Sequence, residues 1–133
     1  FSNIIEAAYI ASDIVVMPCF PDAWSIESCA LTDEDIRESS EKWNVKIPEI
    51  RILLNKYNEN RNASKDAWST LLKEFGDQIL PMKIKDTAEL QNSINSGQSI
   101  FDKGVKASKA LKESFTELSN FICPLQDSSE VIQ

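Results

Sequence analysis

The chain has 133 residues, of which 42% are hydrophobic and 26% are charged, and its net charge at pH 7 is −7. These values predict a globular domain and exclude a membrane-spanning segment, because no apolar run approaches the ~20 residues that a bilayer requires. The acidic excess argues against strong nonspecific binding of nucleic acid by the chain as a whole, although it is compatible with a local basic patch.

The usage of three residue types excludes several kinds of site. The chain has no histidine, which removes Ser-His-Asp and Cys-His catalysis and histidine metal sites. Its three cysteines include no Cys-x-x-Cys pair, so a disulfide framework is not expected and a reducing, cytoplasmic compartment fits best. We expect Cys19 and Cys29 to be small buried hydrophobic residues rather than reactive thiols. The three glycines form no phosphate-binding (Walker A) loop.

The first half of the chain predicts two helices that alternate with two strands. Residues 1–11 are typical of a helix, and Asp13–Cys19 is a continuous apolar run, typical of a strand buried on both faces in a parallel sheet. Ser25–Trp43 is typical of a helix, in one piece or in two, because Thr32–Asp35 (TDED) has the form of a capping box at which a second helix could start. Its acidic cluster is a candidate cation site or, more simply, a solvated first turn. Glu49–Asn55 is the second apolar run and the second predicted strand.

The second half predicts three more helices and one more strand. Ser64–Phe75 is an amphipathic helix with Gly76 as its C-terminal cap. Gln78–Lys85 is a third strand, irregular or late-starting because it contains Pro81. Two helices follow, one over Thr87–Ser96 that ends at Gly97 and one from about Val105 to Ile122. The tail, residues 126–133, is expected to fray.

The last predicted helix is strongly two-sided. Its apolar face is formed by Leu111, Phe115, Leu118 and Ile122. Its opposite face is formed by Lys103, Lys106, Lys109 and Lys112. The simpler interpretation of these lysines is a solvated outer face, and the functional one is a basic stripe that contacts nucleic acid or a protein partner.

The alternation of strands and helices predicts an α/β fold, a doubly wound three-layer α/β/α arrangement with a mainly parallel sheet. In such a sheet the carboxyl ends of the strands share one edge, where ligands bind. The residues that leave the predicted strands at this edge are Pro18–Asp22, Asn55–Asn58 and Lys83–Asp86.

Asn55 carries a donor and an acceptor in one plane, which matches the N6/N7 edge of adenine or a comparable edge of another base. Lys56 is placed to pack its stem on a base or to reach an anion. The simpler interpretation is a polar turn, since asparagines are good loop formers. Lys83 and Lys85 come to the same side of the third strand, where they would balance an anionic ligand.

Three segments resemble the C-terminal half of ParA-type ATPases, the plasmid and chromosome partition proteins related to MinD. They are "ASDIVVMPCFPDAWSIES", "IRILLNKYNENRNASKDAW" and "MKIKDTAELQNSINSGQSIFDKGVKASKALKE". The resemblance covers roughly Asn3–Phe121 and follows the order of the family. It implies that residues 1–125 are the C-terminal portion of a single ParA-like ATPase domain, a P-loop NTPase fold, followed by the tail.

The resemblance also implies a site and a cofactor. The site residues would be Pro18, Asn55, Lys56, Ile84 and Lys85, with Asn55 and Lys56 near adenine and a turn at Ile84-Lys85 closing the other side of the base. Lys85 stands where these relatives often carry arginine, so a bidentate contact would be lost. The cofactor would be ATP or ADP with Mg²⁺ in the full-length protein. The phosphate loop and the catalytic and magnesium-binding acids would lie upstream of Phe1, so this chain alone is not expected to hydrolyse ATP.

The resemblance further implies a nucleotide-dependent dimer, a partition adaptor protein as partner, and no membrane. Nonspecific DNA binding would use Lys103, Lys106, Lys109 and Lys112, against which the net charge counts. The alternative is a non-catalytic α/β protein-interaction module with a degenerate nucleotide site. A receiver-type signalling domain does not fit, because it needs an acidic cluster at the first strand and a lysine after the last.

Overall fold

A computed structural model describes residues 3–124, so the expected fraying of residues 126–133 lies outside the described part of the chain. Two compact units are separated between Asp86 and Thr87. None of the helices within residues 3–124 is long and apolar enough to cross a membrane. The elements in chain order are α1 (Asn3–Ala11), β1 (Ile14–Cys19), α2 (Ala23–Lys42), β2 (Glu49–Tyr57), α3 (Asn62–Phe75), the short 3₁₀ helix η1 (Gly76–Gln78), β3 (Ile79–Lys85), α4 (Ala88–Ser96) and α5 (Lys109–Ile122).

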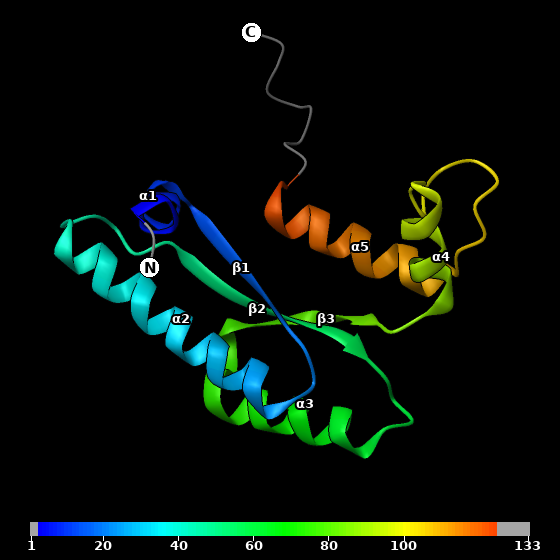
Figure 1. Ribbon diagram of the computed structural model, residues 1–133, viewed down its shortest axis with the longest axis horizontal. Coiled ribbons are helices and arrows are strands. Elements are labelled where there is room, and N and C mark those ends of the chain that lie inside the picture. The colour runs from blue at the N-terminus through cyan, green and yellow to red at the C-terminus, as the bar shows by residue number, and fades with distance from the viewer. Residues whose placement is uncertain (1–2, 125–133) are drawn as a thin grey trace, which may run out of the picture. The chain divides into compact units, whose positions relative to one another are not determined.

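The first unit is built on a three-stranded parallel sheet in the order β1-β2-β3 (Figure 1). Pro18 of β1 lies opposite Leu53 of β2, and Lys85 of β3 lies opposite Tyr57 of β2. Parallel neighbours need a connection that crosses back over the sheet, and α2 and α3 lie within these two crossings. The predicted α/β fold class with a parallel sheet is therefore confirmed, and the arrangement is compatible with a three-layer α/β/α fold.

The core of the first unit lies where α2 and α3 pack on one face of the sheet (Figure 1). Three alternate residues of β2, Ile50, Ile52 and Leu54, belong to this core. The other members are Met17, Cys19, Ile26, Cys29, Ile36, Ala67, Leu71 and Ile79. Leu53, on the opposite face of β2, is buried as well. Burial on both faces is the reason that the strand sequence is a continuous apolar run, and each such side chain contributes about 1.5–3 kcal/mol to folding.

Of the two alternatives for residues 25–43, one helix or two, the structure has one, because α2 is a single helix of 20 residues. Its N-terminus is capped by Asp22, whose Oδ1 accepts a hydrogen bond from the backbone N–H of Ser25 at 2.8 Å. The Thr32 hydroxyl donates to the carbonyl of Ser28, one turn earlier, at 2.8 Å. The hydroxyl thus serves the helix interior instead of capping a new helix.

The acidic cluster that follows Thr32 is therefore in the middle of a helix, not in a first turn. Asp33 accepts hydrogen bonds from Arg37 Nε at 2.7 Å and from Gln78 Nε2 at 2.8 Å. Burial raises the pKa of Asp33, but the hydrogen bonds from Arg37 and Gln78 outweigh it, so the pKa lies below its usual value. The contact with Gln78 joins α2 to η1.

A single carboxylate fastens α1 to the end of α2. Glu6 Oε1 accepts hydrogen bonds from Lys42 Nζ at 2.9 Å and from Trp43 Nε1 at 3.0 Å. These two donors lower the pKa of Glu6. Lys42 is the last residue of α2 and Trp43 is its C-cap. The Glu6 carboxylate therefore joins α1 to the C-terminal end of α2.

Pro81 makes β3 irregular, as predicted, but does not delay its start. Between two paired positions, β3 advances four residues, from Ile79 to Lys83, while β2 advances two, from Ile52 to Leu54. Pro81 lies within this bulge. The prolines of the sheet, Pro18 and Pro81, are on the outer strands, and the central strand has none. This is the distribution expected of a residue that cannot donate to a strand ladder.

The second unit contains α4 and α5 within its described residues. α4 is capped at its start by the hydroxyl of Thr87 and ends at Gly97, whose φ of 66° is left-handed and suits glycine. Both boundaries agree with the sequence prediction.

The start of α5 differs from the prediction, since the helix begins at Lys109 and not near Val105. The Ser108 hydroxyl accepts a hydrogen bond from the N–H of Leu111, which makes Ser108 the N-cap. The Ser108 N–H in turn donates to Glu89 Oε2 of α4 at 3.0 Å. The bond to α4 fixes the backbone just before the helix, so residues 97–108 stay outside it.

Candidate functional site

The carboxyl ends of β1, β2 and β3 lie at one edge of the sheet, because the three strands are parallel. Pro18, Asn55 and Lys85 all lie toward this edge, as the sequence predicts. They are staggered along β2, since Pro18 is opposite Leu53 and Lys85 is opposite Tyr57. Four residues separate these two positions, about 13 Å at the usual rise of a strand. Asn55 is midway between them.

Asn55 is half-buried, and its own neighbour occupies part of its hydrogen-bonding capacity. The Asn55 Oδ1 atom accepts a hydrogen bond from the backbone N–H of Lys56 at 2.9 Å. Within residues 3–124 the Asn55 amide NH₂ has no partner, and the oxygen keeps its second lone pair. The side chain can therefore still donate to and accept from a planar ligand.

Lys56 has an unusual backbone conformation for a residue with a side chain, with φ at 51°. The register of the sheet shifts there, because β2 advances three residues from Leu54 to Tyr57 while β3 advances two, from Lys83 to Lys85. The extra residue forms a bulge that re-aims the end of β2. Lys56 Nζ lies 5.2 Å from the ring centroid of Phe20, which follows β1, so the ends of β1 and β2 are linked by a cation–π contact.

Ile84 and Lys85 do not form the predicted turn. Both are within β3, and the strand ends at Lys85. Ile84 is only 2% exposed, so its side chain is part of the interior. Lys85 Nζ pairs with Glu59 Oε2 at 3.1 Å in a solvent-exposed ion pair. Lys85 is thus at the predicted edge with an anionic partner that the sequence did not indicate.

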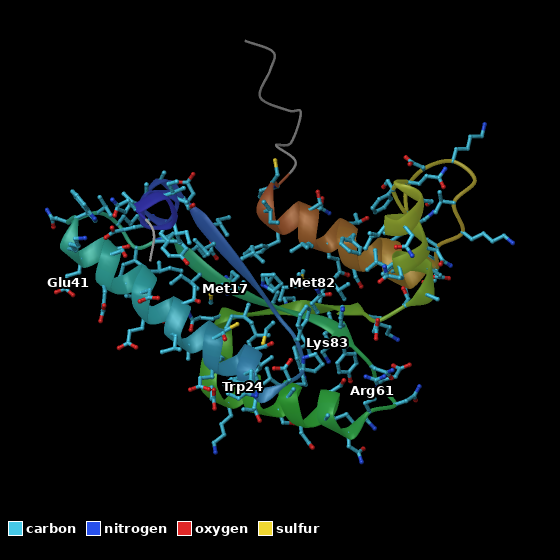
Figure 2. The ribbon with its side chains drawn as sticks, viewed as in Figure 1. Met17, Trp24, Glu41, Arg61, Met82 and Lys83 are labelled. Atoms are coloured by element: carbon cyan, nitrogen blue, oxygen red, sulfur yellow. The ribbon has the colours of Figure 1, made fainter. Side chains whose placement is uncertain are left out.

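Lys83, the other lysine of this strand, is enclosed by aromatic rings. Its Nζ lies 3.8 Å from the ring centroid of Trp68 and 4.7 Å from that of Tyr57 (Lys83 is labelled in Figure 2). Burial lowers the pKa of Lys83. Trp68 belongs to α3, so Lys83 faces the helix layer and fastens α3 to the sheet. It is a structural residue of the first unit.

Pro18 is inside β1, and the chain leaves the strand after Cys19. Pro18 and Phe20 border a hollow of about 410 Å³ along β1, which Ser25, Ser28 and Thr32 of α2 also line. Pro21 directly precedes the helix cap Asp22, so the connection from β1 to α2 is short and stiff.

The four lysines predicted to form one helical stripe are divided between two segments. Lys103 and Lys106 are exposed in the segment before α5, and Lys109 and Lys112 are in its first turn. Lys109 Nζ is 3.5 Å from Glu113 Oε1. The stripe is therefore wrong as a helical feature, although the four lysines remain the candidate contacts for DNA or a partner.

Two structural features were not predicted as sites. The first is a groove between α2 and α3, whose sequence signal is small residues at helical spacing, Ala23 and Ala30 in α2 and Ala63 and Ala67 in α3. The second is the neighbourhood of Cys19 and Cys29. Both are buried, as predicted, and a hydrogen bond with Cys29 together with burial raises the pKa of Cys19. The Cys19 thiol therefore stays protonated near neutral pH, whereas the same hydrogen bond lowers the pKa of Cys29 against the opposing effect of burial.

Within residues 3–124, no group of three or more His, Cys, Asp or Glu side chains is arranged to hold a metal ion. The side chains that the structure places at the sheet edge include the Asn55 amide, Lys85 and the Glu59 carboxylate that pairs with Lys85. Neither a protein-family model nor a curated protein matches the chain. The fold and the sheet edge define an α/β protein with a parallel sheet, and the ParA resemblance remains a prediction from its motifs.

Proposed function

We propose that the chain is the nucleotide-base-binding half of a ParA-like ATPase that acts in plasmid or chromosome partition. The observation that supports this proposal is the parallel register of β1, β2 and β3, which brings Pro18, Asn55 and Lys85 toward one edge. Parallel sheets bind nucleotides at this edge. The order of the three ParA-like segments supplies the family and the biological process.

In this proposal the chain recognises and orients the base. The free NH₂ and the second lone pair of Asn55 face the hydrogen-bonding edge of adenine, and the Lys56 stem packs beside the ring. Lys85 exchanges Glu59 for an anionic part of the ligand. ATP hydrolysis, which needs Mg²⁺, belongs to the full-length protein, whose phosphate loop lies upstream of Phe1. That protein forms a nucleotide-dependent dimer and works with an adaptor.

The proposal is tested by nucleotide titration of the protein encoded by the whole open reading frame, with Mg²⁺ present. We expect ATP and ADP to bind, and Asn55→Asp to weaken both about tenfold, since a carboxylate loses the amide donor at a cost of about 1.4 kcal/mol. The matched control is Asn60→Asp, which makes the same chemical change at an exposed residue of the following turn. Equal affinities for the two variants, or no binding of either nucleotide by the unaltered protein, would overturn the proposal.

The second candidate function is a non-catalytic interaction module with a degenerate nucleotide site. The observation that favours it is the internal engagement of the predicted site, because Asn55 Oδ1 bonds to Lys56 and Lys85 pairs with Glu59. The same titration separates the two functions, since a module of this kind binds neither ATP nor ADP.

A further inference from the structure

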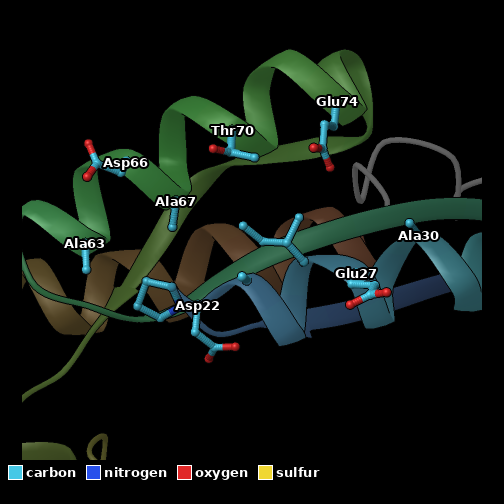
Figure 3. Close-up of a pocket in the computed structure, with 11 residues that line it drawn as sticks. Asp22, Glu27, Ala30, Ala63, Asp66, Ala67, Thr70 and Glu74 are labelled. Carbon is cyan, nitrogen blue, oxygen red and sulfur yellow. The ribbon is translucent and has the colours of Figure 1, made fainter.

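A groove of about 570 Å³ runs between α2 and α3 in the first unit (Figure 3). Its floor is apolar and includes the buried side chains of Ile26 and Ala67. Its walls carry small side chains, Ala30 on α2 and Ala63 on α3. Figure 3 shows Ala67 and Thr70 on the side of α3 that faces α2. Because these side chains are small, they do not fill the space between the two helices, and the floor stays accessible to a ligand.

The charges that line the groove all have one sign. They belong to Asp22, Glu27, Asp66 and Glu74, and no lysine or arginine is among the lining residues. The Asp22 carboxylate caps α2. Within residues 3–124, the carboxylates of Glu27, Asp66 and Glu74 make no hydrogen bond or ion pair, and all three are exposed. Unpaired acids around an apolar floor favour a partner that is apolar on one side and cationic at its flanks.

The shape of the groove selects a helix over an extended peptide. The groove is bounded by helices, whose backbone hydrogen bonds are internal, so an extended segment would find no strand edge to pair with. From Ala63 to Glu74 it follows α3 for eleven residues, about 16 Å at the helical rise. This length accommodates two to three turns of a docked helix with apolar anchors at positions i, i+4 and i+7.

The outer side of α2 extends the apolar surface beyond the groove. Trp24, labelled in Figure 2, is 81% exposed, and Leu31 is 57% exposed. They are seven residues apart and therefore on the same side of the helix. Each adjoins a groove residue in sequence, Ala23 and Ala30 respectively. Large exposed apolar side chains next to a groove are typical of protein-binding surfaces.

We propose that the α2–α3 groove binds a cationic amphipathic helix of another protein, with its apolar face on Ile26 and Ala67 and its basic flanks against Glu27, Asp66 and Glu74. The acidic rim repels nucleic acid and anionic membranes. It also disfavours pairing of this groove with the same groove of a second copy, because like charges would oppose each other. The proposal goes beyond the nucleotide edge and does not rest on it.

The probe is a fluorescein-labelled helical peptide of leucine and lysine, about 18 residues long, with leucines at i, i+4 and i+7. Binding to the whole chain is followed by fluorescence anisotropy at about 0.15 M salt, where long-range attraction is screened. The groove variant is Glu27→Lys/Asp66→Lys. Its matched control is Glu41→Lys/Glu117→Lys, which makes the same change in net charge at exposed residues outside the groove lining. A peptide of identical composition with scrambled leucines tests the apolar contact.

We expect the groove variant to weaken the probe at least tenfold, the control variant to stay within twofold of the unaltered chain, and the scrambled peptide to bind at least tenfold more weakly. Equal weakening by the two variants would show attraction by net charge alone and would overturn the proposal, as would equal binding of the scrambled peptide or no binding. Sedimentation provides a further outcome: a dimer of the unaltered chain that the groove variant abolishes would assign the groove to a second copy. Amide chemical shifts of the unaltered chain, mapped with the probe, decide the question if the groove variant does not fold.

Discussion

The two lysines of β3 have different environments although they are two residues apart. Alternation along the strand places Lys83 and Lys85 on the same side, as the sequence indicates. Within residues 3–124, only Lys83 of the two has its ammonium over aromatic rings, those of Trp68 in α3 and Tyr57 in β2. Lys85 is beyond those rings and pairs with Glu59. The different environments of the two lysines therefore depend on α3, a helix that contacts Lys83 but precedes it in sequence by more than one element.

The lowered pKa of Lys83 makes stability depend on pH in a definite direction. Below its folded-state pKa the lysine is protonated in both states; between that value and the unfolded value of about 10.4, the unfolded chain binds more protons. In this window the unfolding free energy of the unaltered chain should therefore rise with pH relative to that of Lys83→Met. Urea denaturation at several alkaline pH values measures the difference. Lys85→Met, at an exposed lysine, is the control, and parallel curves for the chain and Lys83→Met would contradict the prediction.

At the scale of elements, β2 ends in a bulge at which a residue with a side chain has positive φ. The Lys56 N–H donates to Asn55 Oδ1 and the Lys56 ammonium lies over Phe20. These contacts stabilise a conformation that is costly for any residue with a Cβ atom. The bulge also determines which way Asn55 and Tyr57 point, so the candidate site depends on it.

We expect Lys56→Gly to be more stable than Lys56→Ala by about 1 kcal/mol, because both lose the cation–π contact but only alanine keeps the strained Cβ. Chemical denaturation of the two variants measures the difference. The same pair at Lys46 is the control, since Lys46 is exposed and its φ is not positive. There glycine should be no more stable than alanine. A similar order at both positions would contradict the interpretation of the Lys56 backbone.

Helix boundaries show which part of the fold local sequence determines. Gly76 and Gly97 end their helices as predicted, because each supplies a positive φ within its own turn. The start of α5 was predicted too early, since Ser108 is fixed by Glu89 of α4 as well as by its own helix. Whether a second helix starts at Thr32 was left open by the sequence, because a threonine hydroxyl can bond to the backbone within a helix as well as cap a new one. Sequence signals that depend on one turn of the chain, such as a glycine at a helix end, predict the boundary correctly. Signals whose outcome depends on a contact with another element do not.

The candidate site was likewise predicted only in part from the sequence. That Pro18, Asn55 and Lys85 lie toward one edge followed from the strand pattern alone, since parallel strands present their carboxyl ends together. The predicted turn at Ile84-Lys85 did not follow, because β3 continues to Lys85 opposite the extended end of β2. The bond from Lys56 to Asn55 could not be predicted either, since it depends on a backbone conformation that is rare for lysine.

At the scale of the whole molecule, protection from exchange should follow the sheet order. β2 alone has a strand on each side within the described chain, and its residues 50, 52 and 54 are in the core. We expect the β2 amides to exchange at least about tenfold more slowly than those of β1 and β3, with marginal protection of the outer strands in a dilute monomer. Hydrogen exchange read by NMR measures this. Amides of β1 that outlast those of β2, or firm protection of all three strands, would contradict the prediction.

The two sheet prolines affect whether copies of the chain can pair through their outer strands. An incoming strand lines up on an outer strand by a regular series of amide donors, and proline removes one donor from that series. β1 and β3 each contain such a gap, and at Pro81 the β3 backbone also bulges. A strand from another molecule would therefore lose its register partway along β1 or β3. The loss of register disfavours fibre growth from these two outer strands.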